Sequence, residues 1–313
     1  MTNETNYYIE RLSAERLPDL AKLYRSVYGR SAAKVFFAKK YATAYTGKQY
    51  IGFIAYATNG EPVGYYGVIP CMVLYAGQRM LAAQSADTMT HPQYRFKGLF
   101  VTLANLCYDL CRNEGITLVF GFPNQHSYHG AVQKLGWQLT DTMDCFIIPV
   151  KTIAAEKIMN RLSLLRPIYH RYARFLLKKQ CLPAKQVPDN FPAEGFNGVC
   201  RDEAYMRYKT YQENWLLRAG EAIVWVKIQN GLLIGDMKLG QDDFDDTIRA
   251  VKRLAIKLGL TQLQFHISPG TEVHRLFIGK YDAMPSFPVL FRDLGFNRPL
   301  DAFKFSSADI DIF

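Results

Sequence analysis

Apolar and polar positions along the first half of the chain follow a pattern that predicts a mixture of strands and helices. Strands are expected at residues 7–12, 50–58, 63–74, 80–90, 116–122 and 137–149, and helices at 15–27, 32–45, 99–114 and 126–135. Ser13 is expected to cap the first helix, because a serine side chain accepts hydrogen bonds from the free N–H groups at a helix start. Asn59-Gly60 predicts a tight hairpin, and Gly115 and Gly136 predict helix ends.

The second half repeats much of this order from about residue 190 onward. A helix is expected at residues 202–211, a hairpin at 222–229 and 232–239, a long helix at 243–258 and a strand at 260–268. Two pairs of short stretches resemble each other, Glu114–Leu118 with Leu258–Gln262 and Lys134–Trp137 with Asp293–Phe296. These matches suggest a duplication whose boundary falls in the proline-punctuated connector of residues 150–195.

The loop from His91 to Phe100 is the most informative stretch of the sequence. It follows the strand expected to end at Thr90 and opens the helix expected to begin at Leu99. Free backbone N–H groups and the helix dipole favour negative charge at a helix start. Arg95 and Lys97 add positive charge, and Gly98 allows close approach of the backbone. The loop therefore predicts a site for a phosphate or pyrophosphate group and suggests a nucleotide-bearing cofactor.

Two motifs in this region resemble those of the GNAT superfamily of acyl-CoA-dependent N-acetyltransferases. The family marker (Gln/Arg)-x-x-Gly-x-(Gly/Ala) stands here as Arg95-Phe96-Lys97-Gly98-Leu99-Phe100, with Phe100 in place of a small residue. The second motif is Gly121-Phe122-Pro123-Asn124, followed by a helix and by Leu135-Gly136-Trp137. The resemblance covers about residues 7–149. It implies an α/β (α+β) fold with a mixed, largely antiparallel central sheet flanked by helices, which the second half would duplicate.

The resemblance also implies acetyl-CoA or another acyl-CoA as co-substrate, and residues that hold it. Backbone groups that meet the pantetheine arm are expected at Thr88, Met89 and Thr90, with the N–H of Met89 polarising the thioester carbonyl. The pyrophosphate is expected on the loop residues Arg95, Phe96, Lys97, Gly98, Leu99 and Phe100. Asn124 is expected to meet the pantetheine arm or to order the strand ends.

Acyl transfer to an amine needs one group that removes a proton from the acceptor and another that protonates the leaving thiolate. Asp87 is the candidate base; it could instead be a strand-end cap or surface carboxylate, and His91 is an alternative base that could instead shape the turn. Many family members carry a tyrosine acid where this chain has Val132. Tyr128 lies one helical turn earlier and is the candidate acid, with a packed tyrosine and thiolate departure to solvent as alternatives.

The net charge of +10 is concentrated in the connector. Residues 151–179 carry eight lysines and arginines against Glu156 alone. This pattern is typical of a solvated helical face, and it also fits contact with CoA phosphates, an acidic polymer or an anionic membrane surface. The charge is not interleaved with a base-stacking aromatic pattern or with a known nucleic-acid motif, which argues against a nucleic-acid partner.

Other features of the composition narrow the class of protein. No apolar run approaches the ~20 residues of a membrane span, and the polar start lacks the apolar core of a signal peptide. Six scattered cysteines without a C-x-x-C pair favour a reducing cytoplasm. Cys107 and Cys111, and His126 and His129, have helical spacing but no further ligands nearby, so no metal is expected.

The sequence thus predicts a cytoplasmic N-acyltransferase with an active domain at 1–149, a basic connector at 150–195 and a degenerate domain at 196–313. The second half has carboxylates around residues 242–246, where a phosphate loop would stand, and these would repel a pyrophosphate. The expected acceptor is a primary amine on a small molecule or a surface polymer. The alternatives are a catalytically degenerate module that binds acyl-CoA, and an aminoacyl or peptidyl transferase of the related tandem type.

Overall fold

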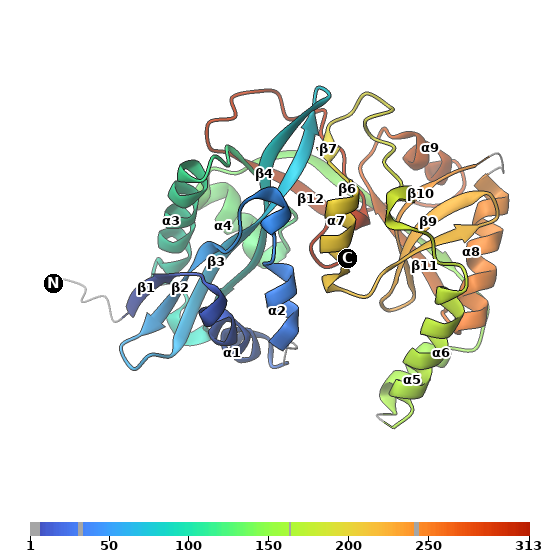
Figure 1. Cartoon of the computed structure of the whole chain (residues 1–313), viewed down its shortest axis with the longest axis horizontal. Coiled ribbons are helices and arrows are strands. Elements are labelled where there is room, and N and C mark those ends of the chain that lie inside the picture. Colours follow the sequence, from blue (N-terminus) through green and yellow to red (C-terminus); the bar gives the residue numbers. More distant parts are fainter. Residues whose placement is uncertain (1–6, 31–33, 163, 241–243) are drawn as a thin grey trace. The chain divides into compact units, whose positions relative to one another are not determined.

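The chain forms two compact units. The structure, a computed structural model, describes residues 7–30, 34–162, 164–240 and 244–313 (Figure 1). Unit 1 comprises Met1–Val73, Gln78–Thr140 and Val289–Asp301, and unit 2 comprises Leu74–Gly77, Asp141–Pro288 and Ala302–Phe313. The chain therefore passes between the units more than once.

Unit 1 is a mixed sheet with helices. Its strands are β1 (Tyr7–Arg11), β2 (Ile51–Ala57), most of β3 (Pro62–Tyr75), β4 (Gln78–Thr90) and β5 (Leu118–Gly121). Its helices are α1 (Leu17–Tyr28), α2 (Lys34–Lys40), α3 (Leu99–Asn113) and α4 (Gln125–Leu135). The pairs β1–β2 and β2–β3 are antiparallel, whereas β4 and β5 are parallel. This confirms the expected mixed, largely antiparallel sheet.

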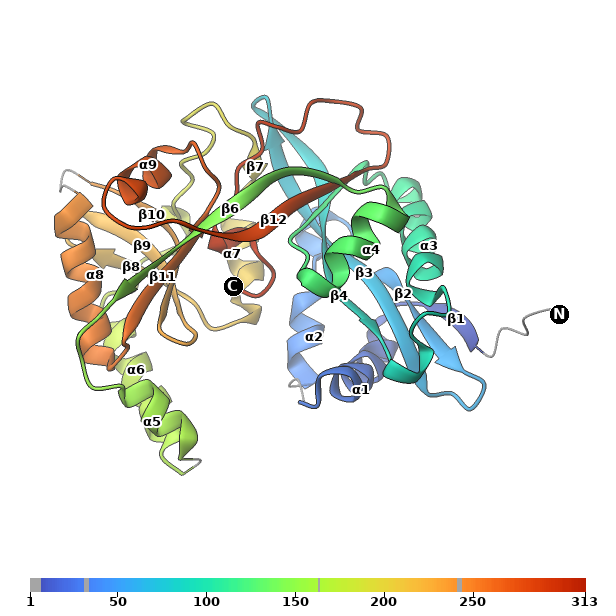
Figure 2. The same ribbon diagram turned by 180° about the vertical axis from the view of Figure 1, so that it is seen from behind.

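Neighbouring residues of β3 show how the sheet of unit 1 is covered on both faces. The ring of Tyr65 lies 6.0 Å from that of Tyr41, directly after α2, and the ring of Tyr66 lies 5.7 Å from that of Tyr108 in α3. Because successive strand residues point to opposite faces, α2 covers one face and α3 the other. Figure 2 shows α3 and α4 in front of these strands. Buried residues of α3 and α4, together with Trp137, form the core on that side.

Unit 2 is also a mixed sheet with helices. Its strands include most of β6 (Gln138–Pro149), β8 (Trp215–Ala219), β9 (Ala222–Ile228), β10 (Leu232–Lys238), β11 (Gln262–Ile267) and the first half of β12 (Met284–Asp293). The short strand β7 (Gly198–Val199) also belongs to it. Its helices are α5 (Ala155–Arg161), α6 (Arg166–Lys178), α7 (Glu203–Tyr208), α8 (Phe244–Leu258) and α9 (Glu272–Ile278). The strands β8, β9 and β10 are antiparallel neighbours, and β10 and β11 are parallel.

Each unit is completed by a strand from the other half of the sequence. The C-terminal residues Leu290–Asp293 of β12 pair antiparallel with β5 in unit 1, and residues Asp144–Pro149 of β6 pair antiparallel with β11 in unit 2. The expected divisions at residues 149 and 195 therefore do not coincide with the compact units. The physical reason is that the unpaired N–H and C=O groups at the open edge of a sheet can pair with any strand that reaches them, whatever the place of that strand in the sequence.

Several local expectations are corrected by the structure. Ser13 makes no capping hydrogen bond; a 3₁₀ turn begins at Ala14, and Arg16 stands at the start of α1. The helix expected at 32–45 ends at Lys40 and is followed by a 3₁₀ turn at Ala44–Thr46. The basic connector packs in unit 2 through α6.

One of the two internal matches also fails. Leu135-Gly136 ends helix α4, whereas Asp293 ends strand β12 and its carboxylate accepts hydrogen bonds from the N–H groups of Gly295, Phe296 and Asn297. The other match holds in conformation. Gly115 and Gly259 are both left-handed and each closes a long helix before a parallel strand.

Candidate functional site

Strand β4 extends beyond the carboxyl end of its parallel neighbour β5. Ala83 pairs with Val119 and Gln84 with Phe120. β5 then ends at Gly121, whereas β4 continues to Thr90. Thr88, Met89 and Thr90, the residues expected to meet a pantetheine arm, therefore lie in the part of β4 that extends beyond β5. The ends of neighbouring parallel strands are the usual place for a ligand in sheets that carry helices after each strand.

The start of α3 has the features of an anion site. Its first residue is preceded by Gly98, which is left-handed (φ 78°) and has no side chain with which to cap the helix. Phe96 is also left-handed (φ 63°) and is fully exposed. Left-handed residues direct neighbouring N–H groups toward a common side, and the first turn of a helix leaves its N–H groups without intrahelical acceptors.

The basic side chains of the loop are exposed beside this helix start. Arg95 donates from Nε to the backbone carbonyl of Thr90 at 3.4 Å, and the ammonium group of Lys97 lies 4.9 Å from the centre of the Tyr94 ring. His91 accepts a hydrogen bond from the N–H of Gln93 at its Nδ1, which favours the turn-shaping role considered for it. Together the loop presents two cations and the uncapped end of a 15-residue helix.

The start of α4 differs because it is capped by its own side chain. Oδ1 of Asn124 accepts hydrogen bonds from the N–H groups of His126 (3.0 Å) and Ser127 (3.1 Å). Only the side-chain N–H₂ group of Asn124 is thus left to meet a ligand by donating. Asn124 follows β5 closely, so its cap orders the segment that leaves the strand end.

Asp87 lies in a buried cluster that the sequence did not reveal. It is left-handed (φ 53°) within β4, a conformation that is strained for a residue other than glycine. Its carboxylate accepts from Nζ of Lys40 (2.8 Å to Oδ2) and from the hydroxyl of Tyr41 (2.9 Å to Oδ2). The side chain of Lys40 is 2% exposed and that of Asp87 is 12% exposed.

The partners of Asp87 keep the carboxylate in a fixed orientation. Burial, and then the charge of Asp87, raise the pKa of Tyr41 well above its ordinary value, so its hydroxyl stays protonated and donates. Lys40 is the last residue of α2 and Tyr41 follows it directly, far from β4 in the sequence. No spacing rule links that helix to β4, so the sequence offered no signal for this pair beyond the presence of a basic and aromatic run.

Phe100 departs from the family pattern, and the structure accommodates it. Its ring packs 5.8 Å from that of Tyr66, on the face of the sheet covered by α3 and α4. A Cβ atom added to Gly130 of α4 would lie 3.1 Å from Cε1 of Phe100, so the glycine makes room for the ring. The large side chain therefore points into the core and leaves the helix start uncovered by its ring.

Tyr128 lies on the first turns of α4 and is half-buried. It packs against the same core as Phe100 and Val132. The structure places Tyr128 after the end of β5 and Asp87 near the end of β4, and it gives them different neighbours. A packed tyrosine and a proton donor are both compatible with this position.

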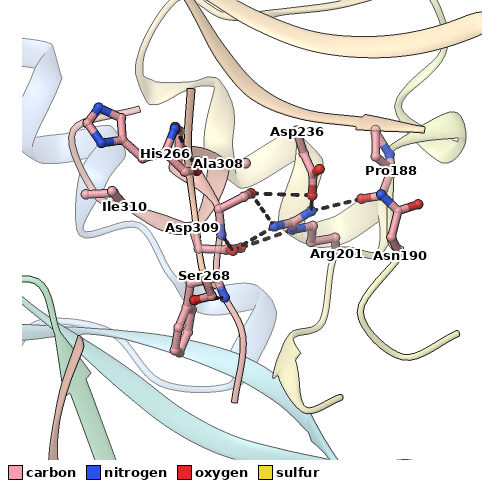
Figure 3. A network of polar contacts seen from close by, with 12 residues as sticks. Pro188, Asn190, Arg201, Asp236, His266, Ser268, Ala308, Asp309 and Ile310 are labelled. Atoms are coloured by element: carbon pink, nitrogen blue, oxygen red, sulfur yellow. Dashed lines mark hydrogen bonds and ion pairs between the residues drawn. The ribbon is translucent and has the colours of Figure 1, made fainter. Parts of the chain in front are cut away.

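Unit 2 carries a buried polar cluster of a different kind (Figure 3). The guanidinium group of Arg201 is fully buried and pairs with Asp236 of β10 and with Asp309 near the C-terminus. Arg201 also donates to the hydroxyl of Ser306 (2.8 Å) and to the carbonyl oxygen of Pro188 (3.1 Å). The contacts of Arg201 therefore join four separate segments of unit 2, which is the pattern of a cluster that stabilises a fold.

Comparison with protein families decides the class of the N-terminal region. Residues 8–140 match the family model of the acetyltransferase (GNAT) domain. This GNAT match includes β4, the basic loop, α3, β5 and α4. The sequence matches no curated protein.

Solved structures share the fold of almost the whole chain at low sequence identity. A GCN5-related N-acetyltransferase from Kribbella flavida is 14% identical with a TM-score of 0.57, over 92% of this chain and 71% of that one. A probable N-acyltransferase of unknown function from Enterococcus faecalis V583 is 12% identical with a TM-score of 0.60, over 93% and 73%. A putative acetyltransferase from Pyrococcus horikoshii is 12% identical with a TM-score of 0.51, over 99% and 96%. At these identities the likeness concerns the fold.

Two features are absent from the residues that the structure describes. Among them, no helix is long and apolar enough to span a bilayer. Within the same part of the chain, no three histidine, cysteine, aspartate or glutamate side chains gather in a way that could hold a metal ion. Residues 241–243 of the acidic stretch lie outside the described residues. Of its other carboxylates, Asp245 pairs with Lys280 and Asp246 with Arg249.

Proposed function

We propose that this protein is an N-acyltransferase that moves an acetyl or other acyl group from acyl-CoA to a primary amine of a small molecule or surface polymer. The observation that carries the proposal is the start of α3, where an uncapped helix, the left-handed Gly98 and two cations follow a strand that extends past its parallel neighbour. This arrangement suits a pyrophosphate. The GNAT match over residues 8–140 supports the same chemistry.

The co-substrate would lie between the ends of β4 and β5. Arg95 and Lys97 would meet the pyrophosphate with their charges, and Phe96, Gly98, Leu99 and Phe100 would meet it with backbone N–H groups. Thr88, Met89 and Thr90 would offer backbone groups to the pantetheine arm, and the N–H of Met89 would stabilise the charge that develops on the thioester oxygen. Asn124 would donate to the arm through its side-chain N–H₂ group. The reaction proposed needs no metal.

Asp87 is the proposed base. The acceptor reaches the site as an ammonium ion and must lose a proton before its nitrogen can attack the thioester carbon. Asp87 is slightly exposed and lies just before the proposed pantetheine segment, and Lys40 and Tyr41 fix its orientation. A positioned group of this kind contributes about 10²–10⁴ in rate. Tyr128 is the proposed donor of the proton that the CoA thiolate takes up as it leaves.

The second half is proposed to be a degenerate copy of the first that does not bind CoA. Support comes from the shared order of an antiparallel strand pair, a long helix, a left-handed glycine and a parallel strand. Asp245 and Asp246 stand in the first turn of α8, where they would repel a pyrophosphate. Binding of acyl-CoA and the six free cysteines are in keeping with a cytoplasmic protein.

Thermal stability with and without acetyl-CoA is the first test of this function. A ligand at ~100 times its Kd should stabilise the fold by about 2.7 kcal/mol. The Gly98→Glu variant should lose this shift, because a carboxylate at the helix start repels the pyrophosphate. Gly60→Glu is the matched control, since Gly60 is also left-handed and a Cβ atom at either position would meet no atom within 4 Å.

The possible outcomes separate the proposed enzyme from its alternatives. A shift that Gly98→Glu abolishes and Gly60→Glu keeps, with thiol release in the presence of amines, supports the acyltransferase. The same shift without thiol release from any amine of a broad panel would identify a binding module. Absence of a shift with acetyl-CoA and with longer acyl-CoA compounds would contradict the proposed cofactor site.

A further inference from the structure

The segment of residues 151–179, which we call the basic hairpin, consists mainly of helices α5 and α6. In Figures 1 and 2 the two helices extend from the rest of unit 2. One stripe of α6, Tyr169, Ala173 and Leu177, is buried in the core of unit 2. The hydroxyl of Tyr169 donates to the carbonyl oxygen of Leu258 at the end of α8, and this hydrogen bond holds the buried side of α6 against the core.

A second stripe of α6 is apolar but faces solvent. Ile168, Tyr172 and Phe175 have the i, i+4, i+7 spacing that places them on one side of a helix, and Phe175 is 59% exposed. The hydroxyl of Tyr172 donates to the carbonyl oxygen of Lys257, so this side chain also has a fixed position. Exposed apolar side chains continue through the rest of the hairpin, at Ile153, Ile158, Leu162 and Leu164. Leu164, in the connecting turn, is 87% exposed.

Cations lie directly beside this apolar surface. Arg171 and Lys178 are exposed on the neighbouring side of α6, and Nζ of Lys179 lies 4.3 Å from the centre of the Phe175 ring. The hairpin has eight lysines and arginines, and its single carboxylate, Glu156, is buried. Arg174 pairs with Glu213, which lies outside the hairpin, and the other cations form a surface that attracts anions and offers apolar side chains between the charges.

We propose that the basic hairpin docks the protein on the surface of a bilayer that contains anionic phospholipid. Such a bilayer presents phosphates at its surface and acyl chains directly beneath, so it satisfies both the cations and the exposed apolar stripe. The hairpin lies in the interface, with Leu162 and Leu164 at its tip and the Ile168–Tyr172–Phe175 stripe toward the acyl chains. The charged heads remain at the level of the lipid headgroups.

The chemistry of the hairpin favours a bilayer over a second copy of the chain or a nucleic acid as its partner. Self-association would bring the cations of one hairpin against those of another, and this is opposed by their charge even though Arg174 is paired with Glu213. A nucleic acid would satisfy the cations but would leave aliphatic side chains such as Leu164 and Ile168 against a phosphate backbone. The basic hairpin is separate in sequence from the loop proposed to bind CoA, so vesicle binding and acyl transfer can be tested independently.

Flotation with phospholipid vesicles tests the proposal. The full chain is mixed with vesicles of phosphatidylcholine alone or with one-third phosphatidylglycerol, at low and at high salt. Binding is expected with the anionic vesicles at low salt, weaker at high salt, and absent with phosphatidylcholine alone. Arg171→Ala/Lys178→Ala is expected to weaken partition about fivefold per charge, the change that corresponds to ~1 kcal/mol per cation near an anionic surface.

A second variant tests the apolar half of the proposal. Ile168→Ser/Phe175→Ser removes two exposed apolar side chains without changing the charge, and it is expected to weaken binding about tenfold. Leu106→Ser is the matched control, because Leu106 is an exposed apolar residue of α3 in unit 1, and it should bind as the unaltered protein does. Unchanged thermal unfolding establishes that each variant is folded.

Three results would overturn the inference. The first is absence of binding to anionic vesicles at low salt. The second is binding that Ile168→Ser/Phe175→Ser leaves unchanged, since a purely electrostatic contact would then suffice. The third is tighter retention on immobilised RNA, or a concentration-dependent dimer that the same variant abolishes, because either would assign the surface to a different partner.

Discussion

Each unit has an aspartate near the end of a strand with a parallel neighbour, and the two aspartates differ in their exposure and in their partners. Asp87 lies near the end of β4, and Asp236 lies near the end of β10, beside an irregularity in its pairing with β9. Each strand leads to a long helix, and each aspartate is paired with a buried cation. Asp87 retains 12% exposure, whereas Asp236 and its partner Arg201 have none.

The surroundings of the two carboxylates explain this difference. Asp236 shares Arg201 with Asp309, and residues of the C-terminal segment complete the cluster. Asp87 pairs with Lys40 of α2 and with Tyr41 directly after that helix, and the segment that follows Asp87 is the one proposed to meet the pantetheine arm. A sealed, fully paired cluster stabilises a fold, whereas a strained and partly open carboxylate is available for proton transfer. The comparison therefore predicts that replacing Asp236 mainly lowers stability, whereas replacing Asp87 mainly lowers activity.

Replacing the buried cation of unit 2 is expected to have the largest effect. Arg201→Met leaves Asp236 and Asp309 buried without a positive partner, and removing one member of such a pair costs about 3–5 kcal/mol. The free energy of unfolding, from urea titration followed by circular dichroism, measures the loss. Because the chain has two compact units, each transition is fitted separately.

Two variants provide the reference for Arg201→Met. Arg207→Met breaks an exposed ion pair with Glu203 and should change the stability by less than ~1 kcal/mol. Lys40→Met should cost less than Arg201→Met, because Asp87 keeps its hydrogen bond from Tyr41 and some contact with solvent. Equal losses of stability for Lys40→Met and Arg201→Met would contradict the proposed difference between the two clusters.

The second effect concerns activity rather than stability. Asp87→Asn is expected to lower kcat of acyl transfer by at least about a hundredfold, because the amide cannot accept the proton of the acceptor amine. Its oxygen can still accept from Tyr41, so the fold should persist. Initial rates of thiol release across a range of pH measure this effect, and the loss should shrink as alkaline pH deprotonates the amine in solution.

Asp236→Asn is the matched change in unit 2. It should reduce stability and leave the rate per folded molecule unchanged. If Asp87→Asn lowered the rate equally at every pH, Asp87 would be a positioning residue and the base would have to be sought elsewhere, with His91 as the next candidate.

The comparison also shows what local sequence can reveal. The loop from Arg95 to Gly98, the helix that follows and the left-handed Gly115 were predictable, because each depends on residues close together in the chain. The pair of Lys40 with Asp87 and the exchange of β6 and β12 were not, because they join segments far apart in the chain. The failed match at Asp293–Phe296 has the same cause, since Leu-Gly-aromatic can end a helix or follow a strand.

The third prediction concerns how the stability of unit 2 depends on pH. Burial lowers the pKa of His266 from 6.5 to about 4. The hydroxyl of Ser286 donates to the carbonyl oxygen of Met143 and therefore accepts from Nδ1 of His266 (3.0 Å), while Gln264 can donate to Nε2 (2.7 Å). These contacts suit the neutral imidazole of His266, in which Nδ1 donates a hydrogen bond and Nε2 accepts one.

The sign of the effect follows from the lowered pKa. Between pH 6.5 and pH 4 the unfolded chain binds a proton at His266 that the folded chain does not, so stability falls as the pH falls. The loss attributable to His266 should be about 2 kcal/mol at pH 5. Urea titrations at pH 7 and pH 5 measure it, with His266→Gln as the comparison and His91→Gln, at a partly exposed histidine of unit 1, as the control. A His266→Gln protein that loses as much stability on acidification would contradict this assignment.

The smallest expected effect tests why Phe100 is tolerated at the start of α3 in unit 1. Gly130→Ala should gain up to ~1 kcal/mol from helix propensity, but its Cβ atom would press on Phe100 at 3.1 Å, so little net change in stability is expected. In a Phe100→Ala background the contact is gone, and the same substitution should stabilise by about 1 kcal/mol. Urea titrations of the unaltered protein, Gly130→Ala, Phe100→Ala and the double variant measure the coupling free energy between the two positions. A gain of the same size in both backgrounds would show that the glycine does not make room for the ring, and acetyl-CoA binding that survives in all four would show that the ring leaves the helix start open.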